Sequence, residues 1–116
     1  MPCTTADFRR IALSLPETEE RKHMNHPDFR VAGKIFATLG YPNKERGTVK
    51  LTPIQQQDFV QSHPAAFSPV YGAWGRQGCT SVLLSEASKG VLKQAILAAW
   101  RNHAPRELVF KSLPQK

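Results

Sequence analysis

The stretch His26-Pro27-Asp28-Phe29-Arg30-Val31-Ala32-Gly33-Lys34-Ile35-Phe36-Ala37-Thr38-Leu39 decides the fold of this chain. Alternating side chains before its centre and an apolar run after it predict two antiparallel β-strands. Ala32-Gly33 between them predicts a tight turn, since glycine adopts positive φ at little steric cost. His26-Pro27 marks the start of the first strand, because proline disfavours a helical residue before it. The hairpin places Arg30 and Lys34 on either side of its turn.

Three helices are predicted around this hairpin, over residues 5–15, 53–62 and 89–104. The first carries apolar side chains at helical spacing, and Pro16 ends it. The last presents a longer apolar face that includes Trp100, which we expect in the core. Hydroxyl side chains that favour helix capping stand at the start of all three: Thr4 or Thr5, Thr52, and Ser85 or Ser88. Gln55, at the third position of the second helix, can complete a capping box with Thr52.

Further strands are predicted at residues 19–24 (an edge strand), 48–51 and 80–84, with a brief extended piece near 68–71. The order is therefore helix, three or four strands, helix, one or two strands, helix. Short connections between strands favour a mainly antiparallel sheet with helices on one face, an α+β two-layer sandwich. Residues 1–104 form one domain on this interpretation. Residues 105–116 form a C-terminal tail that can dock through its apolar side chains, Leu108, Val109, Phe110 and Leu113.

The chain is basic, and its charge is unevenly spread. Its 116 residues carry a formal net charge of +7 and a sequence pI of about 9.9. Residues 76–116 contribute seven Lys and Arg against two Glu, so five of the seven net charges fall in the last third. A positive field of this kind attracts polyanions at modest salt. A merely basic, solvated surface explains the same composition equally well.

Several classes of protein are disfavoured by the composition. Cys3 and Cys79 lie far apart and outside any Cys-x-x-Cys spacing, which favours two reduced thiols in a cytoplasmic protein. No apolar run approaches bilayer length, and the N-terminal segment is amphipathic and charged, so neither a membrane anchor nor a secretory signal is expected. No serine lies in a nucleophile elbow and no pair of carboxylates stands out for acid–base work. We therefore predict no catalytic residues and no enzyme.

The candidate binding residues are basic side chains of the predicted strands and loops together with one tryptophan. We predict that they form one surface that contacts phosphates, with the tryptophan stacking on a base or packing at its rim. The same cations could equally be separate, solvated residues at the edge of the sheet. The five candidates are Arg30, Lys34, Lys50, Trp74 and Arg76.

Two further patterns have competing interpretations. Gly75-Arg76-Gln77-Gly78 matches the loop with which KH domains clamp a nucleic-acid backbone, but tight turns around Trp74 explain its glycines better. His23, His26 and Asp28 are close in sequence, yet an extended backbone need not bring their side chains together. We therefore predict no metal and no cofactor, and a structural role for His26 at the start of its strand.

A family resemblance rests on short motifs spread over residues 5–104. Taken in order, these motifs resemble the MmcQ/YjbR family. The resemblance implies a fold similar to the CyaY-like and secretion-chaperone-like two-layer folds, and DNA binding. Two departures stand out: Cys79 occupies a position where the family usually has tryptophan, and Arg9 and Arg10 replace the acidic ridge of frataxin-like iron binders. The motifs are Asp7-Phe8-Arg9, Leu13-Ser14-Leu15-Pro16, His26-Pro27-Asp28-Phe29-Arg30, the run from Gly33 to Leu39, Val49-Lys50-Leu51-Thr52 and Ala73-Trp74-Gly75-Arg76.

Three functions follow as hypotheses. The first is a non-catalytic protein that binds nucleic acid, with DNA as the expected partner. The second is a protein-interaction or chaperone-like module, whose partner is another protein or a second copy of the chain in a homodimer. It predicts an exposed apolar patch around Tyr71, Trp74, Val109 and Phe110. The third is a small-molecule pocket between the hairpin and the Trp74 loop, lined by His26. The first is the prediction carried forward.

Overall fold

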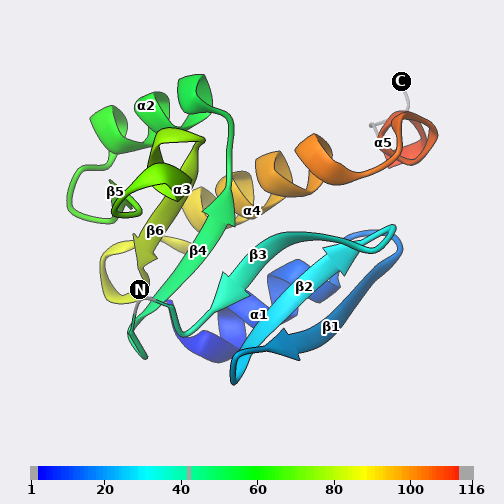
Figure 1. The fold of residues 1–116 in the computed structure, drawn as a ribbon, viewed down its shortest axis with the longest axis horizontal. Coiled ribbons are helices and arrows are strands. Elements are labelled where there is room, and N and C mark those ends of the chain that lie inside the picture. Colours follow the sequence, from blue (N-terminus) through cyan, green and yellow to red (C-terminus); the bar gives the residue numbers. More distant parts are fainter. Residues whose placement is uncertain (1–2, 42, 113–116) are drawn as a thin grey trace.

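The computed structural model describes residues 3–41 and 43–112. It contains one antiparallel sheet of strand order β1-β2-β3-β4-β6-β5 (Figure 1). The expected α+β two-layer sandwich is confirmed. In chain order the elements are α1 (Thr5–Leu13), β1 (Thr18–His23), β2 (His26–Val31), β3 (Lys34–Leu39), β4 (Arg46–Lys50), α2 (Pro53–Ser62), β5 (Phe67–Pro69), α3 (Ala73–Arg76), β6 (Cys79–Leu83), a 3-10 turn (Leu84–Glu86), α4 (Lys89–His103) and α5 (Arg106–Ser112).

Helices α1 and α4 cover one face of the sheet and enclose the core. Figure 1 looks onto the opposite face, with these two helices behind the strands. Trp100 of α4 is fully buried, and its indole Nε1 donates a hydrogen bond to the Pro16 carbonyl at 3.1 Å. Phe8 of α1 packs against Phe29 of β2 with ring centroids 5.8 Å apart. The predicted core role of Trp100 is therefore confirmed.

Local signals in the sequence set the starts of the three longer helices, α1, α2 and α4. Thr4 caps α1 and Thr52 caps α2, each in a capping box, with Asp7 and Gln55 as the respective partners. Of the two serines considered for α4, Ser88 is the cap, since its side chain accepts from the Val91 amide. Helix α1 is two residues shorter than predicted.

The tight turns are those of two-residue hairpins. Ala32 and Gly33 both have positive φ, at 51° and 78°, as a turn that matches strand twist requires. Met24 and Asn25 also have positive φ, which makes β1 and β2 a second such hairpin. The edge position of β1 is confirmed by the strand order.

Two short helices were not predicted. Helix α3 is a single turn within the glycine-rich stretch after Val70. Helix α5 occupies the first part of the expected tail, where Leu108 and Val109 pack on the core and Phe110 is exposed; Leu113 lies outside the described residues. Both missed helices are too short for helical periodicity to show in the sequence.

A β-bulge in the central hairpin decides which side chains face the helices. Phe29 pairs with Ala37 and Arg30 pairs with Ile35, so Phe36 stands outside the register. Phe36 and Ala37 are both fully buried as a result. Ile35 is thereby shifted to the other face of the sheet, which we call the open face and which also carries Arg30.

We predict that Gly75→Ala destabilises the fold, because an added Cβ would lie 1.7 Å from the Val70 carbonyl oxygen. Relieving that overlap requires the backbone to move, at an expected cost of about 1–3 kcal/mol. Thermal unfolding measures the loss.

Gly90→Ala in α4 is the matched control, since a Cβ there meets nothing within 4 Å. It should leave the melting temperature unchanged or slightly raised. Equal melting temperatures for the two variants would contradict the packing described for α3.

Candidate functional site

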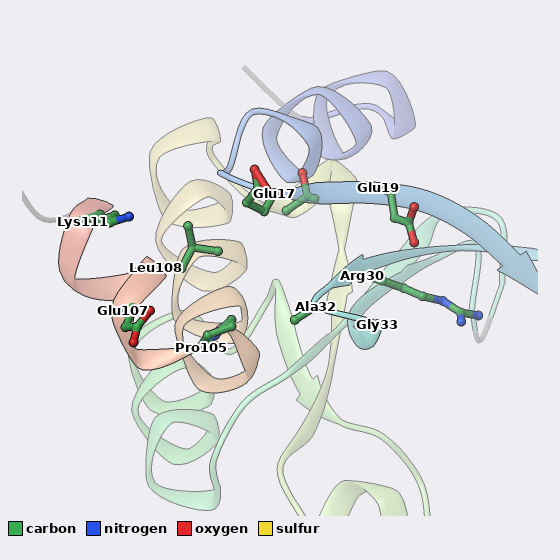
Figure 2. A pocket seen from close by; sticks show the side chains of 10 residues that line it. Glu17, Glu19, Arg30, Ala32, Gly33, Pro105, Glu107, Leu108 and Lys111 are labelled. Carbon is green, nitrogen blue, oxygen red and sulfur yellow. The ribbon is translucent and has the colours of Figure 1, made fainter.

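Arg30 lies on the open face but is not a free cation. Its guanidinium donates to both oxygens of Asp28, with Nε–Oδ1 at 2.8 Å and Nη2–Oδ2 at 3.1 Å. The hydrogen bonds to the Asp28 carboxylate raise the pKa of Arg30 above its already high ordinary value. Arg30 also borders an open cleft between α5 and the β2–β3 turn, where Figure 2 shows its side chain extending along the sheet, away from α5.

That cleft has a volume of about 920 Å³, and carboxylates outnumber cations among its lining residues. The carboxylates are those of Glu17, Glu19 and Glu107, and the cations are those of Arg30 and Lys111 (Figure 2). The surroundings of Arg30 therefore do not favour a polyanion.

Lys34 and Arg76 do not share a surface with Arg30. Lys34 pairs with Val31, and paired residues of antiparallel strands point to the same face, so the register places Lys34 on the helix side of the sheet. Arg76 is exposed at the end of α3, beside β6. The five predicted residues do not form one patch.

Lys50 and Trp74 do come together. The Lys50 ammonium lies 5.8 Å from the centroid of the Trp74 ring, a cation–π geometry, and the Trp74 residue remains 61% exposed. The backbone of Lys50 is held in place by α4, because Asn102 donates to its carbonyl at 3.2 Å. A cation and an exposed aromatic face are thus presented side by side at the end of β4.

A hollow of about 520 Å³ opens beside this pair on the open face, and we call it the Trp74 groove. One side is the tip of the β1–β2 hairpin and the other is the α3 segment. The groove shares His26 and Trp74 with the pocket considered between the hairpin and the Trp74 loop, but the hairpin tip that borders it is that of β1–β2 and not the Ala32-Gly33 turn. Its lining residues are His23, Met24, His26, Ile35, Thr38, Tyr41, Thr48, Lys50, Val70, Trp74 and Cys79.

Close backbone packing fixes the Trp74 side of the groove. Gly75 lies against the Val70 carbonyl and Gly78, at φ 115°, lies against the Leu51 carbonyl, leaving no room for a Cβ at either position. Gln56 of α2 donates to the carbonyls of Gly75 and Cys79, both at 2.9 Å. The glycines therefore serve tight packing.

A backbone clamp of the KH type is not formed by this segment. The amides of Arg76, Gln77 and Gly78 all donate to carbonyls between Gly72 and Gly75. They are consequently not available to bind an anion.

The hairpin side of the groove carries a buried charge cluster that the sequence interpretation missed. Asp28 is 0% exposed, and besides Arg30 it bonds His23, with Nδ1 and Oδ2 2.6 Å apart. The hydrogen bonds from Arg30, and secondarily from His23, lower the pKa of Asp28 despite its burial.

The signal for this cluster was the two-residue turn at Met24-Asn25. A hairpin closed there pairs His23 with His26 and Arg21 with Asp28, which puts His23 diagonally beside Asp28. His26 itself packs edge-on against Tyr41, with ring centroids 5.9 Å apart. No group of three potential metal ligands occurs within residues 3–41 and 43–112.

Both cysteines are free and buried. Cys79 lies opposite Lys50 in the β4–β6 register and lines the groove, and burial raises the pKa of its thiol. At this position the family resemblance implied a tryptophan, so the aromatic surface of the groove comes from Trp74 and Tyr41 instead.

Comparison with solved structures identifies the class of fold. The chain is similar to Deinococcus radiodurans protein DR2400, whose structure is described as a DUF419 domain. The likeness has a TM-score of 0.73 at 18% sequence identity and covers 97% of this chain and 90% of that one. At this identity the match shows a shared fold alone.

The family follows from the sequence match. A family model described as YjbR matches residues 13–102, and the chain belongs to the YjbR family. The resemblance inferred from the motifs is thereby confirmed. A search of curated proteins finds no match. Within the described ranges, none of the helices has both the length and the apolar character needed to cross a bilayer.

Asp28 generates a prediction about acid stability. Its pKa is lowered in the folded protein, so its contribution to stability is fully present above the ordinary Asp pKa of about 4 and is lost as pH falls through the lower folded value. Asp28→Asn should lower the melting temperature at pH 7, and the gap to the natural protein should narrow toward pH 2. Thermal unfolding across pH measures both effects.

Asp58→Asn is the control, because Asp58 is exposed on α2. A gap that stays constant from pH 7 to about pH 2 would contradict the assigned role of Asp28.

Proposed function

We propose that this protein binds nucleic acid as an unpaired strand, held in the Trp74 groove. The single observation that carries the proposal is the pairing of Lys50 with the exposed face of Trp74 at the rim of a concave, largely apolar hollow. Bases of a single strand stack on aromatic side chains, while cations beside them contact the phosphates.

The size and shape of the site support an unpaired strand over a duplex. The groove volume of about 520 Å³ falls in the range of sites that enclose a small molecule. A base that has left its helix can enter such a hollow, whereas a stacked base pair presents only its edge. A basic hairpin inserted into a duplex groove has less support, because Arg30 is paired with Asp28 and Lys34 faces the other way.

A neighbouring hollow extends the path for a strand. It has a volume of about 340 Å³ and shares Lys50, Trp74 and Cys79 with the Trp74 groove. Lys50 and Trp74 thus border both hollows, and on this proposal a ligand longer than one nucleotide extends from one to the other. The net charge of +7 adds a general attraction for the phosphate backbone.

A protein-docking function has weaker support. Figure 1 places α5, which carries Phe110, well away from α3, which carries Trp74. The apolar patch expected from Tyr71, Trp74, Val109 and Phe110 is therefore divided between two regions.

We predict that Trp74→Ala weakens binding of a labelled single-stranded oligothymidylate about 5- to 150-fold in fluorescence anisotropy at low salt, as expected for loss of a stacked base. Lys50→Gln should make the negative slope of log K against log salt shallower by about 0.7, the contribution of one phosphate contact on a single strand.

Lys34→Gln is the matched control, since it removes an exposed lysine on the other face of the sheet. It should change the affinity less than Lys50→Gln does. Absence of binding to the oligonucleotide, tighter binding to a duplex, or equal effects of the two lysine variants would count against the proposal.

A further inference from the structure

We infer that His23 is a second anion-binding residue of the Trp74 groove, held by the buried Asp28 carboxylate that Arg30 also binds, and strengthened by protonation. The inference rests on the proposed function for the identity of the ligand. It adds a residue, a ligand group and a dependence on pH.

The first step is to decide which nitrogen of the His23 ring carries the proton. Asp28 is an ionised carboxylate that can only accept hydrogen bonds, and it lies 2.6 Å from Nδ1 of His23. The proton of this contact therefore resides on Nδ1. The neutral imidazole then has its other nitrogen, Nε2, as an acceptor, and the charged imidazolium has Nε2–H as a donor.

The second step is the position of the ring. The His23 side chain is 42% exposed and lines the Trp74 groove, while its carboxylate partner is fully buried. Arg30 holds that carboxylate from its other side through two hydrogen bonds. A ring anchored in this way loses little further freedom when it binds a ligand.

The third step is the chemistry of the groove as a whole. Lys50 lies at the Trp74 side and His23 at the hairpin side of the same hollow, with apolar side chains such as Ile35 between them. A suitable ligand has a flat apolar body, which packs against Trp74 and the apolar lining, and an anionic group, which reaches His23. For a nucleic-acid strand, the group that reaches His23 is a phosphate.

Protonation of His23 is then linked to binding. The imidazolium donates a charge-assisted hydrogen bond to a phosphate oxygen, which neutral Nε2 cannot do. The titratable or charged groups that face His23 are Asp28, Arg30 and His26 on β2, Arg21 on β1, and Lys50, Tyr41 and Cys79 around the groove. His26 is paired with His23 in the β1–β2 register and lines the same groove, so it needs its own control.

The test uses pyrophosphate as a probe, so that it stands apart from the binding of a strand. Nitrogen NMR of the imidazoles should show the Nδ1–H form of His23 at pH 8 and a shift of its Nε2 resonance on addition of pyrophosphate at pH 5.5. Because pyrophosphate itself gains a proton over this range, its affinity is compared with that of His23→Gln at each pH. The ratio of the two affinities should rise about tenfold between pH 8 and pH 5.5, the size expected for one hydrogen bond to a charged group.

Two glutamine variants separate the histidines. The affinity ratio of the natural protein to His23→Gln should rise as the pH falls, whereas its ratio to His26→Gln should stay constant. An Nε2–H form of neutral His23, a pH-independent ratio to His23→Gln, or a ratio that rises with His26→Gln instead would overturn the inference. Pyrophosphate binding with these features but no binding of oligonucleotides would reject the proposed strand while leaving the anion site of His23 standing.

Discussion

The Asp28 carboxylate is the constraint on which the open face depends. It has no exposed surface, and a buried charge of this kind is tolerated only when it is paired and fully hydrogen-bonded. Arg30 and His23 supply the partners. The pairing withdraws Arg30 from the set of free cations, and it fixes His23 at the hairpin side of the Trp74 groove. The buried Asp28 thus neutralises Arg30 and positions His23 at the groove.

The opposite side of the groove depends on backbone packing. Gly75 and Gly78 allow α3 to lie against the chain at Val70 and Leu51, and Gln56 ties α3 and β6 to α2. These contacts hold the backbone of α3, a helix of one turn, and so fix the position from which the exposed Trp74 side chain extends. The two sides of the groove come from different halves of the sheet, so the site forms only when the strand order is complete.

Much of the fold could be predicted because its signals are local. Capping residues mark the starts of α1 and α2, and the Ala32-Gly33 turn fixes the central hairpin. The site was harder to predict. The bulge at Phe36 shifts Ile35 to the open face, and no short-range pattern in an apolar run reveals such a shift. Of the five residues predicted to share one surface, Lys50 and Trp74 do lie together, but the burial of Asp28 and the loss of Arg30 as a free cation arise from tertiary packing.

The central claim is that ligand binding is confined to the Trp74 groove, and NMR chemical-shift mapping tests it most directly. On titration with a single-stranded oligothymidylate at low salt, the account predicts the largest shifts at His23, His26, Tyr41, Lys50 and Trp74. Residues of the β2–β3 turn and α5 should change little. Shifts spread over Lys34, Arg30 and the α5 cleft, with none at Trp74, would contradict the account.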